Sequence, residues 1–206
     1  MNLPNKITLL RIFLIPVFML CIIPYPEWVL NSSFLEVVRP QLIIVNDFIL
    51  KYGNYLAAVI FIIAASTDGV DGYIARKRKQ VTKFGIFLDP IADKLLVTAA
   101  LIALVQRNEL TGWVAMIIIA REYAVTGLRL VAAGEGTVIA ASTWGKVKTV
   151  TQIIAISVSL MKNFPVSLFS DFPFDRYVMF IAVIITIYSG YDYIAKNAKV
   201  IDYNNI

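Results

Sequence analysis

The chain has 206 residues, of which 59% are apolar and only 16% charged, and its formal net charge is +5. Soluble domains are about 45–50% apolar and about 25% charged, so this composition excludes a disordered chain, a collagen-like chain and a simple soluble enzyme. Because there is no histidine and only one cysteine, Cys21, the chemistry of the chain must use carboxylates, hydroxyls, amines and guanidinium groups.

Six apolar segments predict transmembrane helices, each of which needs about 20 mainly apolar residues. They lie at about residues 7–23, 52–76, 84–106, 110–131, 146–161 and 177–195. The first lacks a small-residue cleavage site, so we interpret it as a retained helix rather than a signal peptide. In residues 27–50, charged residues interrupt short apolar pieces, and this pattern predicts an external loop with an interfacial helix. We find no internal repeat and predict one all-α, polytopic membrane domain over residues 1–206.

The positions of lysine and arginine predict the orientation of these spans, since basic residues concentrate in cytoplasmic loops. One side contains Lys6, Arg76, Lys77, Arg78, Lys79, Lys83, Lys146, Lys148, Lys196 and Lys199. The opposite side has fewer bases, and acids dilute them. We therefore predict a multi-pass protein of the plasma membrane, with both termini and the 76–83 loop in the cytoplasm. Its natural partners are membrane lipid and phosphate groups rather than nucleic acid.

Four aspartates stand at the predicted cytoplasmic ends of the second and third spans. Asp68 and Asp71 are three residues apart, and Asp89 and Asp93 are four apart, so each pair lies on one helix face. Antiparallel spans joined by a short loop can bring all four carboxylates to one depth. A single aspartate at a helix end usually caps the helix. Four acids within a membrane repel one another unless a cation compensates their charge.

Oxygen ligands at this density suit the hard divalent cations Mg²⁺ and Mn²⁺, and four carboxylates could bridge two such ions. Two adjacent metals clamp the attacking and leaving oxygens in many phosphoryl transfers. Arg76 lies one turn beyond the acids, where its guanidinium group can contact a diphosphate. The basic run 76–79 also has a simpler interpretation as a topology signal.

The aspartates are part of a longer pattern, Asp68-x-x-Asp71-Gly72-x-x-Ala75-Arg76, then eight residues, then Gly85-x-x-x-Asp89-x-x-x-Asp93. This pattern resembles the signature of the CDP-alcohol phosphatidyltransferase family at every fixed position. The resemblance implies the fold of that family, with six transmembrane helices, a dinuclear metal site and a homodimer. It also implies that Asp68, Asp71 and Asp89 bind the metals and that Asp93 is the general base and shares in metal coordination. Gly72, Ala75, Arg76 and Gly85 would line the cytidine diphosphate pocket.

The second half of the chain contains more bases than topology requires. Arg129, Lys146 and Lys148 suit an acceptor alcohol that itself has a phosphate. Arg121 belongs to the same group, although it and its neighbour Glu122 form an Arg-Glu pair whose charges can neutralise each other locally.

Several elements of this half resemble the branch of the family whose acceptor is glycerol phosphate. They are Arg121-Glu122, Leu128-Arg129 and Gly145-Lys146-x-Lys148-Thr149-x-x-Gln152. The N-terminal Pro4-Asn5 and Thr8-x-x-Arg11 also resemble the start of the family. By this resemblance we add Asn5 to the expected CDP-binding residues and Arg11 to the expected acceptor-phosphate-binding residues.

The resemblance implies an enzyme that transfers the phosphatidyl group of CDP-diacylglycerol to the 1-hydroxyl of sn-glycerol 3-phosphate and releases CMP, in phosphatidylglycerol biosynthesis. Sister enzymes that use inositol phosphate or serine are the nearest alternative. A divalent-cation transporter is a more distant one, because it needs polar positions across the whole bilayer, whereas residues 55–65 and 95–104 are almost wholly apolar. A non-catalytic scaffold would leave the four acids without a reason.

Overall fold

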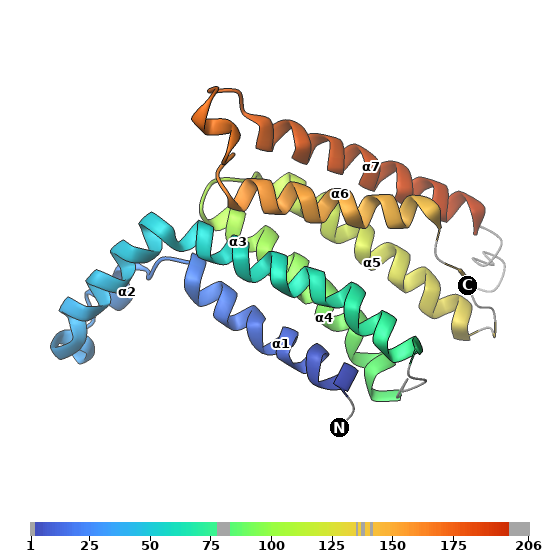
Figure 1. Cartoon of the computed structure of the whole chain (residues 1–206), viewed down its shortest axis with the longest axis horizontal. Coiled ribbons are helices and arrows are strands. Elements are labelled where there is room, and N and C mark those ends of the chain that lie inside the picture. The colour runs from blue at the N-terminus through green and yellow to red at the C-terminus, as the bar shows by residue number, and fades with distance from the viewer. Residues whose placement is uncertain (1–2, 78–82, 135, 137–138, 141, 198–206) are drawn as a thin grey trace. The chain divides into compact units, whose positions relative to one another are not determined.

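The computed structural model describes residues 3–77, 83–134, 136, 139–140 and 142–197. All regular secondary structure in these residues is helical (Figure 1), which confirms the all-α prediction. Backbone contacts divide the chain into two compact units, Met1–Glu109 with Leu160–Lys162, and Leu110–Ser159 with Asn163–Ile206. That residues 1–206 act as one membrane domain stays a prediction.

The first unit is built on three long helices that pack on one another. Its elements are α1 (Leu3–Ile22), α2 (Glu27–Leu30), the 3₁₀ helix η1 (Ser33–Val38), α3 (Arg39–Lys77) and α4 (Lys83–Gln106). Helix α1 packs against α3 and α4, and α3 also packs against α4. Phe18 and Phe61 are fully buried between α1 and α3, with ring centroids 6.4 Å apart. A Cβ atom at Gly53 would lie 2.5 Å from the Cys21 carbonyl oxygen, so glycine is needed for this close approach.

The segment 27–50 differs from the prediction. Helix α3 begins at Arg39 and runs unbroken for 39 residues, so residues 39–50 continue directly into the predicted second span. Arg39 and Asp47 are exposed and do not interrupt the backbone hydrogen bonds, because charge opposes burial in lipid rather than helix formation. At about 1.5 Å per residue the helix is about 58 Å long, well beyond the roughly 30 Å of a hydrocarbon core.

A polar network holds the far ends of α1 and α4 against the middle of α3. Arg107 donates hydrogen bonds to the Ile22 carbonyl oxygen (2.9 Å) and to the Leu50 carbonyl oxygen (3.3 Å). The buried Asn54 donates to Glu109 (2.6 Å), and Glu109 also pairs with Arg107 at 3.4 Å. The carbonyl at the end of α1, which no later turn can satisfy, thus receives a charged donor.

The second unit contains the remaining helices. They are α5 (Gly112–Gly134), α6 (Thr143–Leu160, whose last residue belongs to the first unit), the 3₁₀ helix η2 (Val166–Leu168) and α7 (Phe174–Lys196). Helices α5 and α7 pack on each other and run in the same direction (Figure 1). Helix α6 begins before the predicted span at 146, because the Ser142 hydroxyl oxygen accepts a hydrogen bond from the Gly145 backbone N–H (3.0 Å) and caps the helix.

Each predicted span coincides with one of the helices α1, α3, α4, α5, α6 and α7. The predicted and observed ends agree to within a few residues, except at the start of α3, which begins much earlier than predicted. Within the described residues, two helical stretches are long and apolar enough to cross a membrane, Ser33–Thr67 and Phe174–Lys196. Helix α5 contains Arg121, Glu122 and Arg129 within its length, which lowers its hydropathy. The count of six spans therefore stays a prediction.

Candidate functional site

The four aspartates occupy matching levels on two neighbouring helices of the first unit. Asp68 and Asp71 lie in the last turns of α3, and Asp89 and Asp93 lie in the first half of α4. At about 1.5 Å per residue, all four backbone positions lie within roughly 9–15 Å of the helix ends that residues 78–82 connect. Since α3 and α4 pack on each other, the backbone agrees with one carboxylate cluster at this end.

The structure describes the side chain of Asp93, which is half-buried on α4. The side chains of Asp68, Asp71 and Asp89, and those of the expected CDP-binding residues Gly72, Ala75 and Arg76 on α3 and Asn5 on α1, lie outside the described set. Gly85, the remaining member of that group, is buried on α4. Arg11 is 1% exposed on α1, so it belongs to the interior of the first unit.

The chemistry of the donor set fits divalent cations. All four candidate ligands are carboxylates, spaced by three and four residues on helical backbone, and hard ions such as Mg²⁺ and Mn²⁺ prefer oxygen ligands. Among the side chains that the structure describes, no group of three acids or cysteines could hold a metal. The aspartate cluster is outside that comparison, because three of its four side chains are not described.

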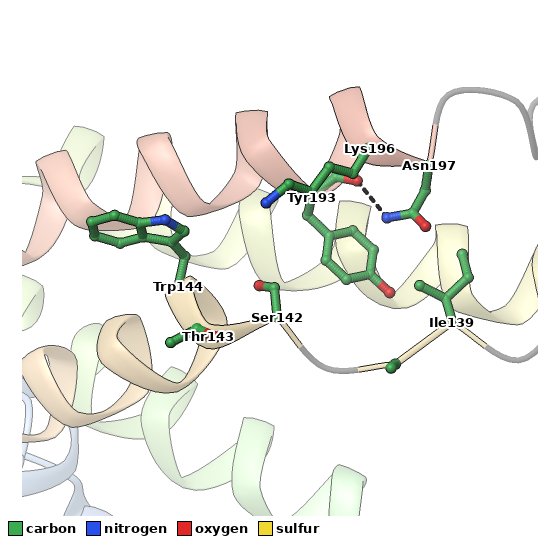
Figure 2. Close-up of a pocket in the computed structure, with 8 residues that line it drawn as sticks. Ile139, Ser142, Thr143, Trp144, Tyr193, Lys196 and Asn197 are labelled. Atoms are coloured by element: carbon green, nitrogen blue, oxygen red, sulfur yellow. Dashed lines mark hydrogen bonds between the residues drawn. The ribbon is translucent and has the colours of Figure 1, made fainter.

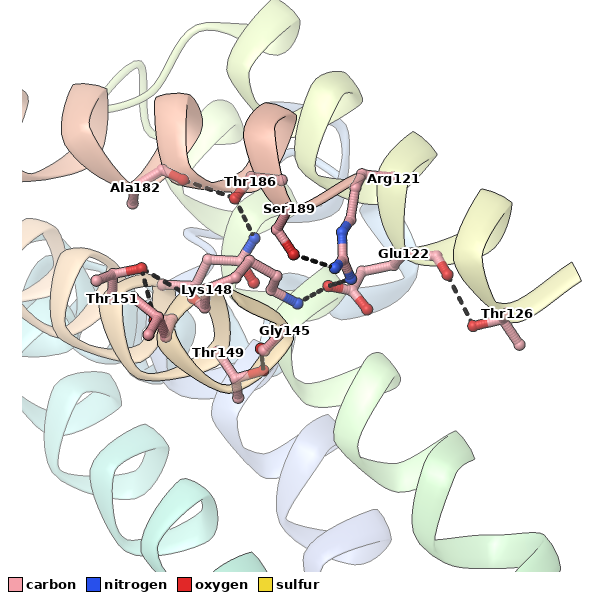
Figure 3. A network of polar contacts seen from close by, with 12 residues as sticks. Arg121, Glu122, Thr126, Gly145, Lys148, Thr149, Thr151, Ala182, Thr186 and Ser189 are labelled. Atoms are coloured by element: carbon pink, nitrogen blue, oxygen red, sulfur yellow. Dashed lines mark hydrogen bonds and ion pairs between the residues drawn. The ribbon is translucent and has the colours of Figure 1, made fainter. Parts of the chain in front are cut away.

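In the second unit, a network of charged and polar side chains centres on Glu122 (Figure 3). Its carboxylate accepts a hydrogen bond from the ammonium group of Lys148, a buried residue on α6. The Arg121 guanidinium group lies farther away, with Nη1 3.8 Å from Glu122 Oε1. Lys148 is therefore the nearer partner of Glu122. The negative charge of Glu122 is balanced mainly by this lysine on α6, and less by its sequence neighbour Arg121, the partner that we considered from the sequence.

Three buried side chains on one face of α7 contact this network and its surroundings. Arg121 Nη2 donates to the Ser189 hydroxyl (2.5 Å), and Arg129 Nε donates to the Tyr193 hydroxyl (2.9 Å). The third is Thr186, whose hydroxyl accepts a hydrogen bond from Gln152 Nε2 on α6 (2.8 Å) and donates one to the Ala182 carbonyl oxygen (2.6 Å). Helices α5, α6 and α7 are thus joined through α7 hydroxyls.

Three bases of this unit lie near these polar side chains. Lys148 and Arg121 lie close to the Glu122 carboxylate, and Arg129 contacts the Tyr193 hydroxyl. Arg121 Nε is buried and has no hydrogen-bond partner among the described residues. Lys146 is exposed and takes no part in these contacts, so the structure joins three of the four predicted acceptor-binding bases of this unit to the polar side chains described above.

A pocket of about 470 Å³ opens beside this region, between the start of α6 and the end of α7 (Figure 2). Its lining residues are Ile139, Ala140, Ser142, Thr143, Trp144, Tyr193, Lys196 and Asn197. Tyr193 therefore borders the pocket and also accepts the hydrogen bond from Arg129. The pocket offers hydroxyl, amide and ammonium groups, which suits a small polar solute.

Ser189, Tyr193 and the pocket lining were not among our predicted site residues. Ser189 lies 68 residues after Arg121 in the sequence, and Tyr193 lies 64 residues after Arg129. Only the packing of the helices brings the members of each pair together. One signal was available, because Thr186, Ser189 and Tyr193 repeat at helical spacing within an apolar segment.

Comparison with known proteins places this chain among lipid-forming transferases. The model of the CDP-alcohol phosphatidyltransferase family matches residues 1–188. The CDP-diacylglycerol–glycerol-3-phosphate 3-phosphatidyltransferase of Bacillus subtilis is 49% identical over 204 residues, which cover 99% of either chain. The enzyme of the same name from Haemophilus influenzae is 33% identical, over 94% of this chain and 91% of its own. A probable phosphatidylglycerophosphate synthase of Mycobacterium tuberculosis is 37% identical, over 95% of this chain and 81% of its own.

Proposed function

The chain belongs to the CDP-alcohol phosphatidyltransferase family, and we propose that it transfers the phosphatidyl group of CDP-diacylglycerol to the 1-hydroxyl of sn-glycerol 3-phosphate. The observation that carries this function is full-length similarity to relatives named for the same donor and acceptor, including one that is 49% identical over 99% of both chains. These names do not favour a sister enzyme with inositol phosphate or serine as acceptor, and they do not favour a cation transporter.

The donor would bind in the first unit, at the end where α3 and α4 meet residues 78–82. Asp68, Asp71, Asp89 and Asp93 would hold two divalent cations, Mg²⁺ or Mn²⁺. When bound, these ions supply positive charge that stabilises the transferring phosphate and the departing CMP. Arg76, Gly72, Ala75, Gly85 and Asn5 would contact the cytidine diphosphate group, where small residues admit the ligand close to the backbone and arginine binds phosphate oxygens.

Asp93 would be the general base, which the chain needs because it contains no histidine. Its carboxylate removes the proton from the 1-hydroxyl of glycerol 3-phosphate, and that oxygen forms a bond to the β-phosphorus of the donor. The bond from this phosphorus to the oxygen of the CMP phosphate breaks, and its electron pair leaves with CMP. The products are phosphatidylglycerophosphate, CMP and a protonated Asp93, which then releases its proton to water.

The acceptor phosphate would be held by basic residues, with Arg121, Arg129 and Lys148 as the main ones and Lys146 and Arg11 as further candidates. A phosphate monoester has a charge of about −1.5 to −2 at neutral pH. Lys148 and Arg121 near Glu122, together with Arg129 beside Tyr193, would supply positive charge for such a group. The pocket beside Tyr193 is large enough for glycerol phosphate to approach these groups.

The membrane arrangement follows from the same premise. Helices α1, α3, α4, α5, α6 and α7 would be six spans of a multi-pass protein, with both termini and the aspartates on the cytoplasmic side. The cytoplasmic excess of lysine and arginine supports this orientation. Acyl chains of the donor would remain in the surrounding lipid, and the family resemblance supports a homodimer.

The decisive experiment is an assay of the purified protein in detergent with CDP-diacylglycerol, Mg²⁺ or Mn²⁺ and a panel of alcohols. We expect CMP release with glycerol 3-phosphate and none with inositol phosphate, serine or glycerol. Release with another alcohol at a comparable rate would contradict the assigned acceptor, and the absence of release with every alcohol would contradict the enzyme class.

A further inference from the structure

Two side chains of α7 lie where they can control how the acceptor-binding arginines point. Ser189 is fully buried and Tyr193 is 1% exposed, and they are four residues apart on one helix face. Their hydroxyl oxygens accept hydrogen bonds from Arg121 and Arg129 (2.5 and 2.9 Å). The two arginines are eight residues apart on α5, on the same side of that helix. Because α5 and α7 pack together and run in the same direction (Figure 1), the earlier arginine meets the earlier hydroxyl residue and the later arginine meets the later one.

We propose that Ser189 and Tyr193 are positioning residues for the acceptor phosphate, each holding one guanidinium group of α5 in its binding orientation. This inference rests on the proposed function, because it concerns the same acceptor. It differs from the assignment of the arginines themselves, since neither hydroxyl needs to touch the substrate.

The geometry of Arg121 supports this role. Its stem passes α7 at Gly190, where an added Cβ atom would lie 3.1 Å from Arg121 Cγ. Nη2 is held by Ser189, and Nη1 lies near Glu122. Nε remains buried without a partner among the described residues. A long, flexible side chain is thus held at its stem by the contact with Gly190 and at its tip by Ser189 and Glu122.

Tyr193 holds Arg129 in two ways. Its hydroxyl accepts the hydrogen bond from Nε, and its ring lies 5.2 Å from the guanidinium carbon, which is within the range of a cation–π contact. Because Arg129 is otherwise exposed, it would adopt many rotamers without this support. Fixing the rotamer before binding reduces the entropy that the acceptor must overcome.

The test is a steady-state kinetic comparison of the full-length enzyme with the variants Ser189→Ala and Tyr193→Phe. We expect the KM for glycerol 3-phosphate to rise about tenfold for Ser189→Ala and several-fold for Tyr193→Phe, which retains the ring contact. We expect kcat and the KM for CDP-diacylglycerol to stay within about twofold. Ser157→Ala, whose hydroxyl bonds only its own helix, and Tyr191→Phe, an exposed tyrosine of α7, are the matched controls and should behave as wild type.

A double variant separates positioning from general loss of structure. If Ser189 acts through Arg121, Ser189→Ala adds nothing to the KM of an Arg121→Ala enzyme, whereas Tyr193→Phe still raises it. Independent, multiplicative effects of Ser189→Ala and Arg121→Ala would overturn the proposal, as would an unchanged acceptor KM in both single variants. A wild-type protein that releases CMP only with another alcohol would instead overturn the proposed function, so the two failures are distinguishable.

Discussion

The two units of this protein hold opposite charges in their polar centres. At one end of α3 and α4 the first unit has four aspartates at matching levels. In the second unit, Lys148 and Arg121 lie near the Glu122 carboxylate, and α7 hydroxyls accept hydrogen bonds from Arg121 and Arg129. We therefore expect the first centre to bind cations and the second to bind an anion.

This difference predicts where each unit is sensitive. A centre made of like charges depends on its bound ions, so we expect removal of those ions to abolish turnover. In a centre whose charges are paired and hydrogen-bonded, each charged side chain depends on its partner side chains. We expect the loss of one partner to lower the stability of the protein or its affinity for substrate. The predictions below test this contrast.

Removal of divalent cations should abolish turnover. Dialysis against a chelator leaves the aspartates of the first unit without the charge that balances them, and we expect no CMP release above background. Addition of Mg²⁺ or Mn²⁺ should restore activity. The thermal unfolding midpoint of the protein should change little, because the contacts of the second unit do not depend on these ions. Full activity in the presence of a chelator would show that the acidic centre works without metal.

Asp93→Asn should lower kcat by about 10²–10⁴, the usual contribution of a general base. Binding of CDP-diacylglycerol should stay close to that of wild type, as measured by ligand protection against thermal unfolding. Asp47→Asn is the matched control, since Asp47 is exposed on α3 far from the cluster. A near-normal rate for Asp93→Asn would remove this residue as the base.

The same contrast explains how much could be predicted from sequence. The aspartates repeat at spacings of three and four within two adjacent segments, so helical periodicity alone places them together. The start of α3 was missed, because Arg39 and Asp47 lower hydropathy without preventing a helix. Ser189 and Tyr193 were missed for another reason. Their role depends on which face of α7 meets α5, and that is decided by side-chain packing across more than 60 residues.

Glu122→Gln should destabilise the protein by about 3 kcal/mol, because it removes the carboxylate charge that pairs with the ammonium group of the buried Lys148. The double variant Glu122→Gln/Lys148→Met should recover most of this loss, since it removes both charges. Thermal unfolding in detergent measures both. Lys196→Met provides the contrast, because the Lys196–Asp192 pair is largely exposed on the lysine side, at 66%, and such pairs contribute little. Equal destabilisation by Glu122→Gln and by the double variant would mean that Glu122 does not stabilise the protein through its ion pair with Lys148.

The smallest expected effect tests the contact between α5 and α7 most sharply. Gly190→Ala places a Cβ atom 3.1 Å from Arg121 Cγ, so the arginine stem must shift by a few tenths of an ångström. Alanine also favours the helix by about 1 kcal/mol relative to glycine, so stability should hold or rise while the KM for glycerol 3-phosphate increases two- to threefold.

Gly127→Ala is the matched control for this change. It makes the same substitution on α5, at a position where an added Cβ atom meets nothing within 4 Å, and it should gain helix stability with no change in KM. If Gly190→Ala raised KM only together with a lower thermal midpoint, the effect would be one of packing. A higher KM in a Gly190→Ala protein that is at least as stable as wild type would show that acceptor affinity depends on the position of the Arg121 side chain against α7.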